Sequence, residues 1–219
     1  MNIHRVICFA MIAFSAHVSL AARLAPQNSK AEKEVAVSSA AAGEVNLGVL
    51  NDRSLDELTK IAFEKENPYE YRWSALQHIS TDYPQQAEEI LLKAAGQNEW
   101  YMKNAALLGL QEMNSKKQIE IAKKLISDDA LVVRSMAVSV LAKNQSPEIR
   151  QLFWSELKKK YNFKRNQSLW IRHQILEHLA EDPQKNEREK FLELINEKDK
   201  KIQSISKNVI IKIQTKAFR

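Results

Sequence analysis

Apolar side chains recur along most of this chain at intervals of three and four residues, which is the spacing of one helical face. The pattern begins near Ser54 and continues to about Ala217, and alternation typical of β-strands is hard to find. Only four glycines and five prolines occur among the 219 residues. The pattern therefore predicts an all-α fold after Asn51.

A nine-residue pattern occurs five times, with apolar residues at its start and at the fourth, fifth and eighth positions after the start. In four copies a basic residue follows the start. The copies are YRWSALQHI from Tyr71, MKNAALLGL from Met102, VRSMAVSVL from Val133, IRHQILEHL from Ile171 and ISKNVIIKI from Ile205. Their starts are 31, 31, 38 and 34 residues apart, and a period of this length is typical of helical solenoids.

A partner helix is expected before each copy. Ser54 and Glu57 form a capping-box pattern, and Ser146-Pro147 and Asp182-Pro183 place a cap before a proline in the first turn. We also expect Asn67, Asn98 and Asp129 to cap the repeated helices. The partner helices are predicted at Ser54 to about Lys65, Pro84–Ala95, Ser115–Ser127, Ser146–Lys160 and Pro183–Glu197. About five helix pairs are therefore expected in residues 52–217.

The pattern Asp/Asn-x-x-x-Val-Arg-x-x-Ala-x-x-x-Leu resembles the second helix of a HEAT repeat, especially the short bacterial form. The resemblance spans about three quarters of the chain and implies a right-handed α-α superhelix of about five helix pairs. It is weakest at Ile205, where Ser206 replaces the basic residue, as in a terminal capping repeat. The resemblance also implies that the basic residues form a ladder between neighbouring repeats, through hydrogen bonds and paired charge. These residues are Arg72, Lys103, Arg134 and Arg172. The alternative is a basic stripe that binds an anionic ligand.

The first 21 residues have the pattern of a secretory signal peptide. Met1–Arg5 carries a positive charge, Val6–Leu20 is mostly apolar, and small residues precede a cleavage site after Ala21. This pattern predicts a bacterial protein that is periplasmic or secreted; the alternative is an uncleaved membrane anchor. Residues 22–51 are predicted to be a flexible linker, followed by the repeat domain at 52–217. Cleavage would remove Cys8, the one cysteine, and so excludes disulfides and thiolate chemistry in the mature chain.

Composition does not favour an enzyme. The formal net charge of +6 is too small to indicate nucleic-acid binding, and the charges are spread along the helices apart from Lys158–Gln167. His173 and Glu177 could share a metal, but two ligands do not make a site, and no phosphate loop, serine elbow or HExxH motif is present. We therefore predict no catalytic, metal-binding or cofactor-binding residue and no cofactor. The alternative is an enzyme similar to HEAT-like alkylpurine DNA glycosylases, although no concave-face Asp accompanies a Trp.

Two surfaces are candidates for partner binding. The first is the concave face, which is expected at the second and sixth positions after the start of each copy of the pattern. These positions hold small polar residues such as Asn104 and Ser135 together with larger side chains. The second is the insertion Lys158–Gln167, which lengthens the third interval; the alternative is a helix extended by one or two turns, with its aromatic residues packed on the next repeat. The predicted partner-binding residues are Trp73, Leu108, His173, Glu177, Lys159, Lys160, Tyr161, Phe163, Lys164 and Arg165.

These surfaces predict a non-catalytic scaffold, adaptor or inhibitor that binds another envelope or secreted protein with an acidic patch. Nucleic acid is not an expected partner, because successive basic residues are missing from the concave positions before Lys207. An anionic membrane surface or polymer is the alternative ligand for the insertion.

Overall fold

The computed structural model describes residues 47–144 and 146–216, and all of these residues belong to one compact unit. The predicted signal peptide and residues 22–46 of the predicted linker lie outside the described ranges. No helix within these ranges is long and apolar enough to cross a membrane.

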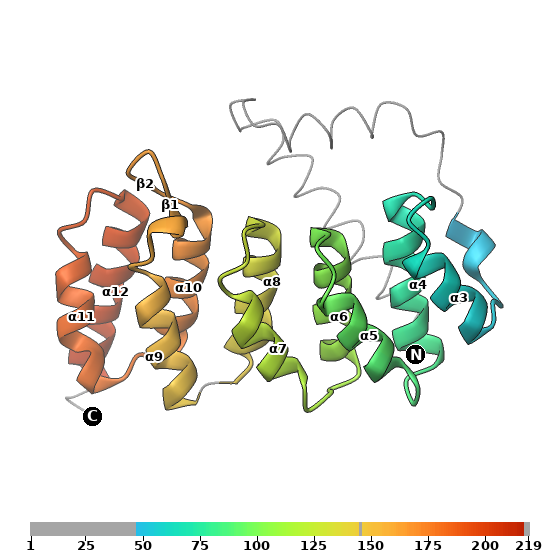
Figure 1. The fold of residues 1–219 in the computed structure, drawn as a ribbon. Helices are drawn as coiled ribbons and strands as arrows, with labels where there is room; N and C mark the ends of the chain where they lie inside the picture. Colours follow the sequence, from blue (N-terminus) through green and yellow to red (C-terminus); the bar gives the residue numbers. More distant parts are fainter. Residues whose placement is uncertain (1–46, 145, 217–219) are drawn as a thin grey trace. The chain divides into compact units, whose positions relative to one another are not determined.

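Ten α-helices in the described residues pack as five sequential pairs, which confirms the all-α solenoid (Figure 1). The first helices of the pairs are α3 (Leu55–Phe63), α5 (Ala87–Ala95), α7 (Gln118–Leu125), α9 (Pro147–Glu156) and α11 (Arg188–Leu194). The second helices are α4 (Tyr69–Asp82), α6 (Trp100–Glu112), α8 (Leu131–Ala142), α10 (Trp170–Glu181) and α12 (Lys200–Lys216).

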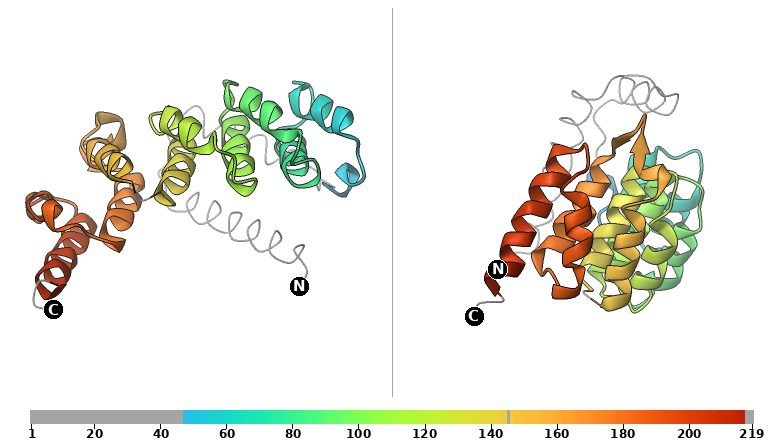
Figure 2. Two further views of the ribbon diagram at one scale, coloured as in Figure 1. Left: turned by 90° about the horizontal axis from the view of Figure 1, so that it is seen from below. Right: turned by 90° about the vertical axis from the view of Figure 1, so that its left-hand side faces the viewer.

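The repeated pattern forms the second helix of every pair. Each second helix packs against the next one, from α4 through α12, so these helices form a continuous layer (Figure 2). The predicted apolar face is buried in all five copies, except that Tyr71 and Ile205 at the starts of the first and last copies are half-buried. The small side chains of Ala75, Ala106 and Ala137 are fully buried between the helices.

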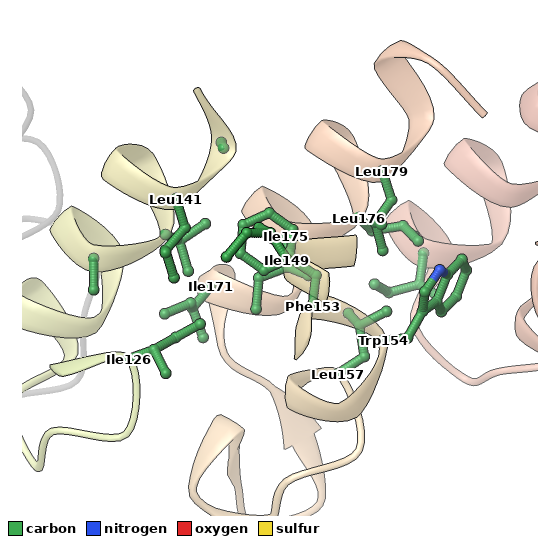
Figure 3. Close-up of a cluster of buried hydrophobic side chains, with 14 of the residues drawn as sticks. Ile126, Leu141, Ile149, Phe153, Trp154, Leu157, Ile171, Ile175, Leu176 and Leu179 are labelled. Atoms are coloured by element: carbon green, nitrogen blue, oxygen red, sulfur yellow. The ribbon is translucent and has the colours of Figure 1, made fainter. Parts of the chain in front are cut away.

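The core is divided into two clusters of apolar side chains. One fills the first two pairs, and the other extends from Leu107 to Ile213. Figure 3 shows part of the second cluster, where Ile149 and Phe153 of α9 lie among Leu141 of α8 and Ile175 of α10. Burial of each such aliphatic side chain contributes roughly 1.5–3 kcal/mol.

Packing begins within the segment predicted to be a linker. Leu47–Leu50 forms a 3-10 helix that contacts α4. The side chain of Leu50 is only 2% exposed and belongs to the first core cluster. Leu50 therefore covers the end of the first helix pair.

Two of the predicted helix starts are confirmed. Ser54 and Glu57 form the reciprocal capping box that opens α3. Ser146 accepts a hydrogen bond from the Ile149 amide, 3.3 Å away, and Pro147 occupies the first turn of α9.

The other predicted caps are wrong. Pro68, Glu99 and Ala130 precede α4, α6 and α8 without a capping side chain. Asn67 donates instead to the Ile61 carbonyl, 3.1 Å away, and so satisfies the C-terminal end of α3.

The start predicted at Asp182-Pro183 is also wrong. Gln184 opens a 3-10 helix, Lys185–Glu187, through a capping box, and α11 begins only at Arg188.

The insertion is a β-hairpin rather than the end of an extended helix. Helix α9 ends at Glu156, and a 3-10 turn (Lys160–Asn162) leads into strands β1 (Phe163–Lys164) and β2 (Gln167–Ser168). Phe163 pairs with Ser168, and Lys164 pairs with Gln167. The prediction of a helix to Lys160 is therefore wrong, because the chain turns to form the hairpin. The hairpin protrudes beyond the helix ends at the upper edge of Figure 1 and in the right-hand view of Figure 2.

Candidate functional site

The hairpin is supported by the basic residues of the repeat, which form the predicted ladder. Arg172 of α10 is 1% exposed. Its Nε donates to the Leu157 carbonyl, 2.8 Å away, and its terminal nitrogens donate to Glu197 at 2.6 and 3.0 Å. It also donates to the Ser168 hydroxyl of β2. One guanidinium thus joins α9, the hairpin and the loop before α12.

Arg134 of α8 makes the corresponding contacts one repeat earlier. Its side chain donates to the carbonyls of Asp128 at 2.6 Å and Asp129 at 3.0 Å, which lie in the loop of its own repeat. It also donates to the Tyr161 carbonyl of the insertion, 3.2 Å away. Arg134 is 3% exposed, so its charge joins neighbouring repeats rather than facing solvent.

The first two ladder residues reach the loop of the next repeat in the same way. Arg72 bonds the Ala62 carbonyl at 3.0 Å and lies 3.5 Å from the Glu99 carboxylate. Lys103 lies 2.5 Å from the Asp128 carboxylate. The ladder is therefore present in all four predicted copies. The acids that pair with Arg72, Lys103 and Arg172 come from the following repeat rather than from the predicted N-cap positions, and Arg134 bonds a backbone carbonyl of the following repeat instead.

Two aromatic residues of the insertion lie against the ladder. The guanidinium carbon of Arg172 is 4.2 Å from the centre of the Phe163 ring, and that of Arg134 is 5.4 Å from the centre of the Tyr161 ring. The Tyr161 hydroxyl also donates to the buried Glu156 carboxylate at 2.6 Å. Burial and this hydrogen bond raise the pKa of Tyr161. Both aromatic residues therefore anchor the hairpin.

The basic side chains of the insertion point away from this anchor. Within the described residues, Lys159, Lys160, Lys164 and Arg165 are exposed and form no ion pair, whereas Lys158 lies 3.5 Å from Glu193. The tip of the hairpin is the two-residue turn Arg165-Asn166, with φ angles of 51° and 62°. Positive φ at both positions is the geometry of a type I′ turn, which favours Asn and Gly. Arginine is an unfavourable residue for this backbone, which suggests that its side chain has a role.

Trp170 is a candidate contact residue that sequence reasoning missed. It is the first residue of α10, directly after the hairpin, and 49% of it is exposed. An aromatic residue at the end of an insertion was the available signal, but the repeat pattern did not indicate that its ring would be exposed. Exposed tryptophan is a frequent contact residue in protein interfaces.

The loop before α12 lies beside the hairpin. His173 Nε2 is 2.8 Å from the Asp199 carboxylate, and Asp199 also accepts a hydrogen bond from Ser168 of β2. Burial acts to raise the pKa of Asp199, but hydrogen bonds from His173, the Ile202 amide and Ser168 outweigh it and lower the pKa to about 2. Lys198 and Lys200 flank this carboxylate and are exposed, without an ion pair to the described residues.

We call the combined surface the cationic edge. It consists of Lys159, Lys160, Lys164, Arg165, Lys198 and Lys200, together with the exposed Trp170 that follows the hairpin. Of the acids in the second loop, Glu197 pairs with Arg172, and Asp199 is hydrogen-bonded to His173 and Ser168. The edge therefore presents six cationic groups.

The charge of the chain is concentrated in the same half. Residues 52–144 contain 12 basic and 14 acidic side chains, a net charge of −2, whereas residues 146–216 contain 16 and 10, a net charge of +6. Five of these 16 basic side chains lie in Lys158–Gln167, the one stretch that the sequence sets apart from an otherwise even spread of charge. A charge difference of this kind favours attraction of an anionic partner to the last two pairs.

The predicted concave positions are mostly engaged between second helices. Asn104 is buried, so the prediction that these positions are exposed is wrong there. The Ser135 hydroxyl donates to the side-chain Oε1 of Gln174 at 3.0 Å, and the side-chain Nε2 of Gln174 donates to the Ser139 hydroxyl at 2.9 Å. These positions face the neighbouring helix because consecutive second helices pack directly against one another.

The predicted residues of this face do not form one surface with the hairpin. Trp73 and Leu108 are half-buried on α4 and α6, in the first two pairs. His173 is paired with Asp199, and the exposed Glu177 lies 2.7 Å from Lys201. Among the described residues, no group of three or more His, Cys, Asp or Glu side chains could hold a metal ion.

A buried ion pair fixes the helices behind the hairpin. Arg150 of α9 donates through Nε to Glu187 at 3.0 Å, and Trp154 donates its indole N–H to the same carboxylate at 2.7 Å. Arg150 also bonds the Leu179 carbonyl of α10 at 3.1 Å. Burial acts to raise the pKa of Glu187, but the hydrogen bonds from Arg150 and Trp154 outweigh it and keep the pKa below its usual range.

Comparison with known families supports the repeat architecture. Residues 55–158 match the HEAT repeats family, from the start of α3 to the first residues of the insertion. Comparisons with curated proteins and with solved structures found no match.

Proposed function

Because residues 55–158 are a HEAT-repeat region, we propose that the protein is a non-catalytic scaffold that binds another protein through its cationic edge. Stacked repeats of this kind provide extended surfaces for protein binding. In this chain the hairpin is an addition to the regular stack, and insertions on one face of a solenoid often carry function.

The observation that carries the proposal is the anchored hairpin. Arg134 and Arg172 hydrogen-bond the insertion that contains it. Four basic side chains of this insertion are exposed and have no ion pair to the described residues. A surface that is already ordered loses less conformational entropy on binding. The hairpin is thus built as a fixed contact rather than as a flexible loop.

The proposed setting is the bacterial envelope or the outside of the cell. It rests on the signal-peptide pattern of residues 1–21, with cleavage after Ala21. The protein would act there as an adaptor or an inhibitor of another envelope or secreted protein. Mass spectrometry of the protein recovered from cells tests this setting, and a polypeptide that begins at Ala22 is the expected result.

The binding function is tested by affinity capture from envelope and cytoplasmic fractions with the immobilised protein. We expect one envelope protein to be retained in stoichiometric amount, and Lys164→Gln/Arg165→Gln to reduce its recovery about tenfold. The matched control is Lys116→Gln/Lys185→Gln, which removes the same charge from the loops between helix pairs and should retain the partner. Recovery of nucleic acid, or of scattered cytoplasmic proteins alone, would contradict the proposal.

A further inference from the structure

We propose that the cationic edge recognises a linear acidic segment of the partner, and that an apolar side chain of this segment packs on Trp170. The inference rests on the proposed scaffold function and specifies the chemistry that the scaffold recognises. It is supported by three features of this surface: its positive charge, the fixed backbone of the hairpin and the exposed indole of Trp170.

The charge of the edge requires an anionic ligand that spans two loops. Lys164 and Arg165 lie at the tip of the hairpin, and Lys198 and Lys200 lie beside Asp199, which bonds Ser168 of the same hairpin. Of the acids between these groups, Glu197 is paired with Arg172, and Asp199 is held by hydrogen bonds from His173 and Ser168. An extended chain with carboxylates at several positions can contact both loops, whereas a single carboxylate cannot.

The tip of the hairpin is suited to carboxylate recognition. Arg165 presents a planar group that can bind a carboxylate through two hydrogen bonds. It lies in a turn with positive φ, and the pairing of Lys164 with Gln167 fixes the backbone on either side of that turn. The residue that is unfavourable for the turn is thus the residue that is most useful for the ligand.

Trp170 offers an apolar contact directly after the hairpin. Its indole is half-exposed and follows β2 by two residues. An acidic segment that also contains a Leu or Phe could bury this ring, and aromatic anchors of this kind provide much of the affinity in interfaces. Specificity would then come from the apolar residue and attraction from the carboxylates.

Nucleic acid and membrane fit the same surface less well. Binding of single strands depends on aromatic faces that are free to stack on bases, but Phe163 and Tyr161 lie against arginines. Binding to a bilayer requires several apolar side chains that insert together. Besides Trp170, the exposed large side chain of the insertion is Tyr161, which is 38% exposed but is held by Arg134 and Glu156. A polypeptide therefore matches the surface best.

Fluorescence anisotropy with a labelled 12-residue peptide tests the inference with the full-length protein. The peptide contains eight Glu, two Leu and two Gly residues, and a second peptide replaces both Leu residues with Gly. We expect Lys164→Gln/Arg165→Gln to weaken binding about tenfold and Trp170→Ala to weaken it by a similar factor for the first peptide only. Lys116→Gln/Lys185→Gln should bind as the unchanged protein does.

Competing ligands provide the contrary outcomes. Stronger binding to single-stranded DNA of equal charge, or to phosphatidylglycerol vesicles, would overturn the choice of a polypeptide. If Lys116→Gln/Lys185→Gln weakened peptide binding as much as Lys164→Gln/Arg165→Gln, binding would depend on the overall charge of the protein and not on the cationic edge. If affinity capture still yields one envelope protein while neither peptide binds, the scaffold function stands and the acidic-segment inference fails.

Discussion

In the first three helix pairs, α3 to α8, copies of the pattern start every 31 residues. The charged residues in the short loops between paired helices are mostly acidic there. In the last two, α9 to α12, the interval lengthens to 38 residues, a hairpin replaces a short loop, and a buried ion pair joins α9 to the segment before α11. The HEAT-repeat match ends at residue 158, the first residue of the insertion that contains the hairpin.

The difference shows how a solenoid can gain an insertion without losing its packing. The second helices keep the same buried face on both sides of the insertion. The ladder is also unbroken, because Arg134 bonds the Tyr161 carbonyl where Lys103 bonds a carboxylate one repeat earlier. The hairpin is therefore added to an existing set of contacts and leaves the apolar stack unchanged.

The largest loss of stability should follow from breaking the buried Arg150–Glu187 ion pair, which lies in the last two helix pairs. Glu187→Gln leaves Arg150 buried without its counter-charge, and we expect the free energy of unfolding to fall by about 3 kcal/mol. Chemical denaturation measures this change. Glu148→Gln, which alters an exposed carboxylate paired with Lys123, should cost less than about 0.5 kcal/mol. Equal losses in the two variants would contradict the prediction, because the buried ion pair would then contribute no more than the exposed one.

The next effect concerns the ladder at the junction of the two regions. Arg134→Met removes three hydrogen bonds to loop carbonyls and should cost about 2 kcal/mol. The substitution should also increase the rate of amide hydrogen exchange more in the hairpin than in α4, because the Tyr161 carbonyl loses its hydrogen bond from Arg134. Unchanged exchange at the hairpin would refute the anchoring role of Arg134.

Acid should weaken the last two pairs in particular. The Asp199 carboxylate has its pKa lowered from 3.8 to about 2 in the folded protein, so its stabilisation is complete above about pH 4 and is lost as pH falls through 2. The loss should be roughly 1–2 kcal/mol. Denaturation between pH 5 and pH 2 measures it, and Asp199→Asn should remove that part of the pH dependence. If the variant and the unchanged protein lose stability in parallel, the prediction is wrong.

The smallest effect should separate stability from binding at the tip of the hairpin. Arg165→Asn places a residue that tolerates positive φ in the type I′ turn, and we expect a gain of up to about 1 kcal/mol in unfolding free energy. Binding of the acidic peptide should weaken at the same time. A variant that is less stable, or that binds equally well, would contradict the view that Arg165 is present for its side chain.

The sequence predicts the repeat well because a single buried face determines it. The five copies, the ladder residues and the five pairs all follow from periodic apolar and basic positions. The hairpin could not be predicted in this way: its two-residue strands are too short to show alternation, and its turn contains neither Gly nor Pro. The exposed Trp170 and the pairing of Arg150 with Glu187 were also missed, because both depend on how distant segments pack.

Site-specific photo-crosslinking in cells tests the role of the cationic edge most directly. A photoreactive amino acid replaces Lys164 in one variant and Lys185, in the loop before α11, in another. The account predicts one discrete crosslinked protein from position 164, with its crosslink in an acidic segment, and little or none from position 185. Crosslinks of equal yield at both positions, or crosslinks from position 164 to nucleic acid or lipid, would contradict it.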